Sequence, residues 1–553
     1  MDADGAGAAR TLRRSRGRGL GARAGRRSAV RLPAALAAVA VLAAACSSSA
    51  GSTAASGSAG SSSSAGATGK TLVVAAPQGP PTLDPTSNAA QAIDYVVDYN
   101  VLQHLVQLSP NGAITPVLAT GYTLSADRKT YTFTIRPGVK FSNGDPLTPA
   151  DVIFSINRVN AKGSKYPYAA VFNVASAKAA GSDQVAVTLK APDWSFLFNL
   201  ASYSNGVIVD PKTVGTLATN PVGTGPYTIS GNVANFSTTL KVNPSYWGTK
   251  PGVAGVEFRY FSDSNAEESA LQNGQVQLGY LPTPADLPTF KNNPDKYGVL
   301  AGLSNGKVQL TINNTAGPFK SLLVRQAVNY AISKSAVNQV AAGGQGVPIG
   351  TDSVPSDPYY VNLAGLYPYN PAKAKQLLAK AGYPSGFSTT LTLPPYYYAG
   401  LAAPVIQSEL AAVGIKVTIK NVAFPLWLSQ VFTGGNFDLT IIDHAEARDL
   451  GNYGTPGYYW HYAGTSKVAA QLAAANAAPT QAQWIAGTKT VLNEIAADAV
   501  NAWLYVLPGI EVYDKGLTGL PVSGYTEALD LQYASYGGAA PPASATKLGY
   551  SSS

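Results

Sequence analysis

The chain has 553 residues, of which 46% are hydrophobic and 12% charged, and this length predicts more than one core at roughly 100–200 residues per domain. The formal charge of +9 is uneven, because residues 1–45 hold nine arginines and two acids and leave 30 basic against 28 acidic residues from Cys46 onward. A nucleic-acid-binding protein needs a basic patch on its folded part, so this near-balance argues against that class.

The amino-terminal segment has the parts of a secretory signal. An arginine-rich stretch precedes the apolar run 32–45, which as a helix reaches only about 21 Å and is too short for a bilayer core of about 30 Å. Cys46, the only cysteine, follows at once, and residues 42–46 (LAAAC) resemble a bacterial lipobox with Ala43 where leucine is commoner. We therefore expect a lipoprotein signal peptide over 1–45 and lipidation of Cys46, with cleavage by ordinary signal peptidase as the alternative.

The segment after the cysteine has the composition of a linker. Residues 47–69 contain only Ser, Ala, Gly and Thr, which cannot bury a core. A flexible chain of this length has a root-mean-square reach of roughly 26 Å. We expect residues 46–69 to be a lipid-anchored tether and residues 70–553 to fold, without disulfide or thiolate chemistry because no other cysteine exists.

The folded region alternates strand and helix patterns and is predicted to be mixed α/β. Residues 131–135 alternate apolar and polar side chains, which is typical of a half-buried strand. Thr148, Pro149 and Asp151 have the spacing of a capping box that opens a helix. A second helix is predicted over about residues 321–341.

A third helix is punctuated at both ends, and three strands follow it. Asn370 is the expected cap, Pro371 begins the helix and Gly382 ends it. The strands are expected at 387–393, 414–422 and 437–442.

Enzyme motifs are few, and no cofactor is implied. The chain has three histidines, His104, His444 and His461. So few histidines limit general-base chemistry. Residues 302–306 match the G-x-S-x-G pattern of a hydrolase elbow, but an alternating strand follows where that motif needs a helix, so a hairpin turn is expected there. We expect the protein not to be an enzyme, and a secreted hydrolase is the least favoured function.

Several blocks resemble one family in the same order along the chain. They are 130–141 (TYTFTIRPGVKF), 143–148 (NGDPLT), 151–155 (DVIFS), 220–227 (NPVGTGPY), 243–247 (NPSYW), 324–331 (VRQAVNYA) and 369–375 (YNPAKAK). Together they are similar to the family 5 extracellular solute-binding proteins, the dipeptide, oligopeptide and nickel class of ABC importers. The resemblance spans about residues 71–530.

The resemblance implies an α/β fold like the type II periplasmic binding proteins, with two lobes around a cleft and an extra inserted domain. The lobe and insert ranges that it implies are about 71–94, 218–309 and 505–553 for lobe I, 95–217 for the insert, and 310–504 for lobe II. A ligand between the lobes would favour closure, because it contacts both. The implied partners are an ABC permease and ATPase and the membrane surface, reached through Cys46, with the protein itself a monomer.

The loop after the strand at 437–442 is the first candidate ligand site, because ligands of α/β lobes bind beyond the carboxyl ends of strands. In peptide-binding relatives this loop carries a tryptophan, which aligns with His444, and an aspartate, which aligns with Ala447. The charged residues around that position are candidate ligand contacts: Asp443, Glu446 and Asp449.

Aromatic and amide side chains add further candidates, because Tyr and Trp offer flat apolar area with a polar tip. The remaining candidates are Tyr397, Tyr459, Trp460, Asn314 and Asn88. A short peptide is the favoured ligand. A nickel or metal chelate held by His444 and His461, a sugar, or a surface sensor that imports nothing are the alternatives.

Overall fold

The computed structural model describes residues 68–552, apart from 89, 165, 167–168, 170–171, 203, 281–285, 526–527 and 538–539, and these residues belong to one compact unit. The expected signal peptide and the lipidation site Cys46 lie outside the described residues. The first strand begins at Thr68, so it takes in the last two residues assigned to the linker.

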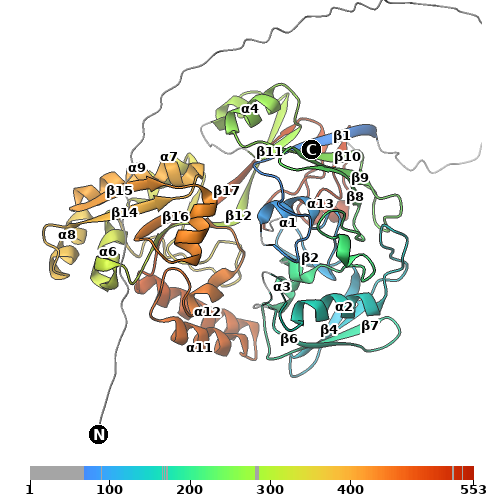
Figure 1. Ribbon diagram of the computed structural model, residues 1–553, viewed down its shortest axis with the longest axis horizontal. Helices are drawn as coiled ribbons and strands as arrows, with labels where there is room; N and C mark the ends of the chain where they lie inside the picture. Colours follow the sequence, from blue (N-terminus) through green and yellow to red (C-terminus); the bar gives the residue numbers. More distant parts are fainter. Residues whose placement is uncertain are drawn as a thin grey trace, which may run out of the picture. The chain divides into compact units, whose positions relative to one another are not determined.

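The fold is built on one mixed sheet of eleven strands (Figure 1). Its order is β15-β14-β16-β12-β17-β11-β1-β10-β9-β8, with β13 paired to β17. The strands are β1 (Thr68–Ala76), β8 (Tyr227–Val233), β9 (Ser237–Val242), β10 (Val253–Tyr260), β11 (Leu278–Tyr280), β12 (Tyr297–Ile312), β13 (Val347–Pro348), β14 (Phe387–Leu393), β15 (Ile415–Asn421), β16 (Leu439–His444) and β17 (Ala502–Asp514). We call the half with β1 and β8 to β11 the first lobe and the half with β14 to β16 the second lobe.

Only β12 and β17 belong to both halves, and they pair antiparallel from Tyr297–Asp514 to Leu310–Ala502. At one end β17 pairs with β11, and at the other β12 pairs with β16. The register of the β12–β17 pair shifts between Leu303 and Lys307. This break, where extra residues bulge from β12, is where the chain passes from one lobe to the other.

A separate four-stranded sheet of order β4-β5-β7-β6 forms the insert (Figure 1). Its elements are β4 (Ala119–Leu124), β5 (Thr130–Ile135), β6 (Val174–Ala179), β7 (Gln184–Leu189), α2 (Pro149–Asn160) and α3 (Phe196–Ser202). The insert has its own buried core, which includes Phe133, Val187 and Ile156. The small pairs are β2 (Val106–Leu108) with β3 (Ile114–Pro116), and β18 (Leu517–Thr518) with β19 (Ser535–Tyr536).

Helices cover both faces of the second lobe's half-sheet, because Val308, Leu310, Leu439 and Ile441 lie in one core and Ile442 and Trp503 in another. The first core packs against α6 (Leu322–Ala331), α7 (Lys334–Ala342), α8 (Pro371–Lys380) and α9 (Tyr397–Ala412). The second packs against α11 (Thr465–Asn476) and α12 (Gln481–Ala497). The other helices are α1 (Gln91–Val97), α4 (Ser264–Gln272), α5 (Leu287–Lys291), α10 (Phe424–Trp427) and α13 (Ala543–Lys547).

Local sequence rules predicted most of these boundaries. The capping box at α2 is confirmed, with the Thr148 backbone N–H donating to Asp151 at 2.8 Å. Asn370 caps α8 by accepting from the Lys373 backbone N–H at 2.9 Å. The prediction of one helix over 321–341 is wrong, because a new cap at Ser333 separates α6 from α7.

The hairpin turn predicted at residues 302–306 is also wrong. These residues lie within β12, at its register shift, and the chain continues in the same direction. The glycine and serine residues at 302–306 form part of a bulge between the lobes. The sequence pattern alone is equally compatible with a turn. Between residues 68 and 552, no helix that the structure describes has both the length and the apolar character needed to cross a membrane.

One buried acid of the first lobe has no counter-charge among the residues that the structure describes. Glu267 of α4 is only 3% exposed, and its Oε1 has no hydrogen-bond partner within the described residues. A Cβ added to Gly279 of β11 would lie 3.1 Å from this oxygen, so the acid packs directly on the strand. Burial raises the pKa of Glu267 to about 8.

Replacement of this acid should therefore stabilise the protein. Between pH values of roughly 4.5 and 8, Glu267 is protonated in the folded state and ionised in the unfolded chain. The free energy of unfolding therefore falls as pH rises through this window. We expect Glu267→Gln to raise the free energy of unfolding by about 1–3 kcal/mol at pH 8 and to have little effect near pH 4. Urea unfolding at the two pH values measures this, with Glu268→Gln as the control on the same helix; an equal effect of both variants would contradict it.

Candidate functional site

Strand β16 sends its last two side chains to opposite faces of the sheet. Successive residues of a strand alternate between faces. Ile441 lies in the core beneath α6 to α9 and Ile442 in the core beneath α11 and α12. Asp443 therefore faces the α9 side, where its backbone N–H donates to the Tyr398 hydroxyl at 3.1 Å, and His444 faces the α12 side.

A buried ion pair holds the loop that follows β16. Lys307 Nζ of β12 lies 2.7 Å from Asp449 Oδ1, and the two side chains are 3% and 5% exposed. The same ammonium donates to the Glu446 backbone carbonyl at 2.9 Å. Burial alone would lower the pKa of Lys307, but the attraction of Asp449 and Asp352 raises it, so the lysine stays charged.

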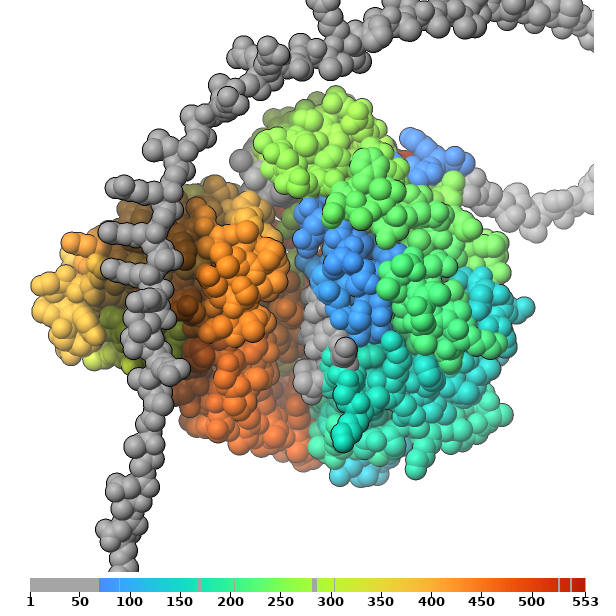
Figure 2. All heavy atoms as spheres, viewed as in Figure 1, coloured from blue at the N-terminus to red at the C-terminus, as the bar shows by residue number. Residues whose placement is uncertain are grey.

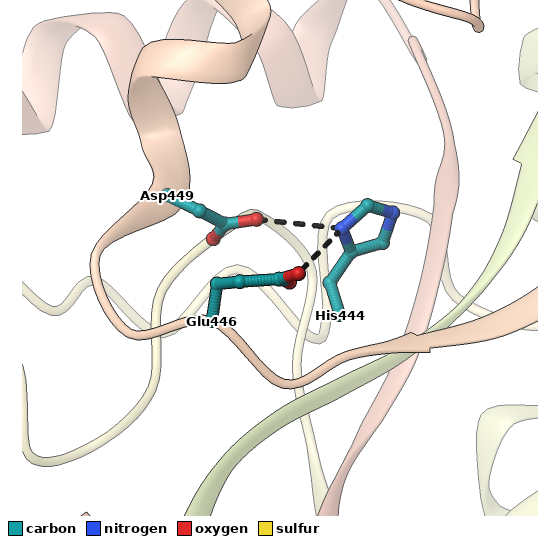
Figure 3. A group of neighbouring side chains, drawn as sticks. All are labelled: His444, Glu446 and Asp449. Atoms are coloured by element: carbon teal, nitrogen blue, oxygen red, sulfur yellow. Dashed lines mark ion pairs between the residues drawn. The ribbon is translucent and has the colours of Figure 1, made fainter. Parts of the chain in front are cut away.

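His444 completes this network from the strand (Figure 3). Its Nδ1 lies 3.4 Å from Asp449 Oδ2 and 3.8 Å from Glu446 Oε2, and its Nε2 lies 2.8 Å from the Tyr459 hydroxyl. Burial opposes the charged imidazole, yet the effects of Tyr459 and Asp449 raise the pKa of His444 well above its ordinary value. Burial likewise opposes ionisation of Asp449, but Lys307 and His444 hold its pKa below the ordinary range. The loop is thus closed by two cations on one carboxylate.

The same three side chains have the ligand types of a metal site. One ligand atom each of His444, Glu446 and Asp449 lies within 4.8 Å of the others. However, Asp449 already binds the Lys307 ammonium, and a neighbouring divalent cation would be repelled by it. His461, the second histidine of the metal hypothesis, does not belong to this group. The geometry therefore favours an internal salt-bridge network over a metal site.

Arg448 of the loop reaches across to the insert. Its guanidinium carbon lies 3.6 Å from the centroid of the Phe198 ring in α3, and its Nε lies 3.6 Å from Asp357 Oδ1. A cation over an aromatic face is attracted by the ring, so this contact ties the second lobe to the insert. The guanidinium thus has one aromatic and one anionic neighbour in the protein, although its Nε is buried with no hydrogen-bond partner among the described residues.

Asp443 differs from the other acids of the loop. Its Oδ1 has no hydrogen-bond partner, and its carboxylate forms no ion pair with any Lys, Arg or His that the structure describes. It lies against the lobe boundary, since a Cβ on Gly306 would be 2.6 Å from both of its oxygens. Burial raises the pKa of Asp443 to about 7, although Lys307 and His444 act to lower it. The residue is half-buried, and its one buried oxygen without a partner needs a hydrogen-bond donor.

The tyrosines around Asp443 come from both lobes. The hydroxyl of Tyr397, at the start of α9, shares a hydrogen bond with that of Tyr280, at the end of β11. Tyr505 of β17 is fully buried, and its hydroxyl has no partner among the described residues. Burial raises the pKa of Tyr505, and the nearby Tyr397 and Asp443 add to this effect. Asp443 and Tyr397 thus lie at the junction of the two lobes.

The other expected ligand residues have internal partners, although Asn314 Oδ1 and Trp460 Nε1 are buried with no hydrogen-bond partner among the described residues. Asn314 donates to the carbonyls of Ile312 and Val500 at 2.8 and 3.0 Å, which links the strand ends. Trp460 is fully buried, with its ring stacked on Tyr453 at 4.4 Å between centroids. Asn88 is exposed and accepts from the Ala90 backbone N–H at 2.9 Å just before α1, apart from the loop.

The second lobe and the insert touch at the rim of the cleft between them. Arg128 donates to the carbonyls of Ala478 and Asn476, and Trp194 Nε1 donates to Ala478 at 2.9 Å. The Trp194 ring stacks on Trp484 of α12 with 6.3 Å between centroids. Figure 2 shows the two surfaces, orange and teal, meeting across a narrow furrow. These contacts join the second lobe to the insert.

Sequence reasoning missed Lys307, Tyr280, Tyr505 and Glu511, although the first carries a signal. Lys307 opens the alternating pattern KVQLTI, in which it belongs to the polar face. That pattern predicts an exposed lysine, because it contains no information on the α11–α12 layer that covers this face. The tyrosines occur in ordinary strand patterns and give no local sign of a site.

Comparisons with known proteins show the family and the fold of this chain. Residues 113–470 match the family described as Bacterial extracellular solute-binding proteins, family 5 Middle. The glutathione-binding protein GsiB of Salmonella paratyphi A is 32% identical over 357 residues, which is 63% of this chain and 69% of GsiB. The binding protein AgaA from A. tumefaciens R10, solved with agropinic acid, has a TM-score of 0.74 at 26% identity and covers 84% of this chain and 99% of its own. DppA from Helicobacter pylori, solved with the peptide STSA, has a TM-score of 0.73 at 23% identity over 85% of this chain and 98% of its own.

Removal of the buried cation should unfold this region. Lys307→Met leaves the buried carboxylate of Asp449 without its closest cation, and we expect a loss of about 3–5 kcal/mol in the free energy of unfolding. Lys212→Met is the control, because Lys212 pairs with Asp145 while 72% exposed, and it should cause no measurable change. Urea denaturation of both variants tests this; equal stability of the two would show that the buried pair is not what holds the loop.

Proposed function

We propose that this chain, which belongs to the family 5 bacterial extracellular solute-binding proteins, captures a short peptide between its two lobes. Members of this family bind small solutes outside the cytoplasm and deliver them to the permease of an ABC importer. Among the relatives, GsiB is named for glutathione, and the DppA structure contains the peptide STSA. The proposal therefore concerns the class of solute and the residue that recognises it.

The single observation that supports a peptide is the carboxylate of Asp443. It lies at the lobe junction, with one buried oxygen that has no hydrogen-bond partner within the described residues. The α-ammonium of a peptide would supply both the missing donor and the missing counter-charge. Glu446 and Asp449 are less suited, since Asp449 is already paired and Glu446, with its side chain 40% exposed, faces the other side of the strand.

Closure follows from where this residue lies. Asp443 belongs to the second lobe, while Tyr280, whose hydroxyl interacts with the same carboxylate, belongs to the first. A ligand that contacts both is bound more tightly by the closed form, and it shifts the population toward closure only by that difference in affinity. The closed form is then the one offered to the permease.

The first experiment compares peptides with and without a free ammonium. We expect Ala-Ala-Ala to bind and its N-acetylated form to bind weakly or not at all. Asp443→Asn should weaken binding of the free peptide roughly 10- to 100-fold, as expected for a lost charged hydrogen bond. Isothermal titration calorimetry gives both affinities.

Glu446→Gln is the matched variant, because it neutralises an acid of the same loop that faces away from Asp443. It should leave the affinity within twofold. The reverse pattern, a loss with Glu446→Gln and none with Asp443→Asn, would move the ammonium site to the His444 side of the strand. Equal binding of free and acetylated peptide would reject ammonium recognition altogether.

Lipid anchoring at Cys46 is the second part of the proposal. It rests on the sequence 42–46 (LAAAC) and the linker that follows. In a bacterial host we expect the full chain to take up labelled palmitate and to sediment with membranes, and Cys46→Ser to do neither. Release of the wild-type protein into the soluble fraction would indicate cleavage by ordinary signal peptidase instead.

A further inference from the structure

A row of polar side chains connects Asp443 with a second carboxylate in the first lobe. Tyr280 and Glu511 stand directly opposite each other on the paired strands β11 and β17, so their side chains share one face of the sheet. The Tyr280 hydroxyl donates to the Pro508 carbonyl at 3.3 Å, which aims it along β17 toward the second lobe. There it shares a hydrogen bond with Tyr397, and both hydroxyls lie near the charge of Asp443. The row therefore runs from Glu511 through Tyr280 and Tyr397 to Asp443.

The row contains polar atoms that are buried and have no partner among the residues that the structure describes. They are Asp443 Oδ1, Glu511 Oε2 and the hydroxyl of Tyr505, a residue with no exposed surface. Buried polar groups in native proteins are nearly always satisfied by protein, water or ligand. Two carboxylate oxygens and a hydroxyl together call for hydrogen-bond donors.

No Lys, Arg or His that the structure describes forms an ion pair with a carboxylate of this row. The two cations that act on Asp443 from the protein, Lys307 and His444, are both bound to Asp449 on the opposite face. Burial raises the pKa of Glu511 to about 7, and no charged group of the described residues acts against this rise. Two half-buried carboxylates, each with one buried oxygen and no counter-charge among the described residues, are best matched by two cationic groups on the ligand. An anionic solute would meet repulsion here.

We propose that the site selects solutes with two cationic groups, one bound by Asp443 and the other by Glu511, with the tyrosine hydroxyls between them. This inference rests on the proposed function, because it assigns the solute class of the same cleft. Among short peptides the class is those that combine a free α-ammonium with a basic side chain. Simple diamines carry the same pair of charges without a peptide bond.

The test measures selectivity, which a merely misfolded variant would not change in a ligand-dependent way. Calorimetry on the exported full-length protein compares Ala-Lys-Ala with Ala-Ala-Ala, and 1,4-diaminobutane and 1,5-diaminopentane with butylamine. We expect the lysine peptide and at least one diamine to bind tenfold or more tightly than their singly charged partners. Glu511→Gln should remove that preference while leaving Ala-Ala-Ala within twofold, and Asp443→Asn should weaken both peptides.

Asp514→Asn is the control variant, since it neutralises an acid on the same strand, near Lys70 and Lys296, and should leave the preference intact. Equal binding of the two peptides by the wild type, or an unchanged preference in Glu511→Gln, would overturn the second cation site while ammonium recognition by Asp443 stands. Binding of diamines without peptides would retain the dicationic class and reject the peptide. Absence of binding by every probe would overturn both.

Discussion

The pairing of β12 with β17 is the constraint on which the rest of the structure depends. These two strands are the ones that the first and second lobes share. Their register breaks between Leu303 and Lys307, where extra residues of β12 have no partner on β17. A bulge bends its strand and alters the local twist.

The loop after β16 illustrates how alternation along a strand separates charges by function. His444 faces the α12 layer, where it joins Lys307 and Asp449 in a network that neutralises itself. Asp443, one residue earlier, faces the α9 layer, where no described cation pairs with it. Adjacent residues in the sequence thus have opposite electrostatic environments. The unpaired acid is better suited to bind a cationic solute, because a carboxylate that is already paired with an ammonium is neutralised by it.

The Lys307–Asp449 network and the tyrosine-lined row differ in how far the protein compensates the burial of their charges. The Lys307–Asp449 pair compensates its desolvation by close contact at 2.7 Å and by further hydrogen bonds to the loop backbone. In the row, desolvation raises the pKa of both Asp443 and Glu511 to about 7 with no comparable compensation from the protein. The difference marks one cluster as a structural tie and the other as a place where a ligand completes the structure.

The sequence by itself determined the mixed α/β class, the helix caps at Thr148 and Asn370, most strand positions and the resemblance to one family, because these depend on neighbouring residues and on patterns of period two or 3.6. It also pointed to Asp443 as one of several loop acids, since β16 was visible as a buried strand. Only the tertiary structure decided which acid is unpaired and that Tyr280 and Glu511 lie in line with it. The physical reason is that ion pairs and burial depend on residues far apart in the chain: Lys307 is 142 positions from Asp449 and Tyr280 is 231 from Glu511, and no local pattern records such contacts.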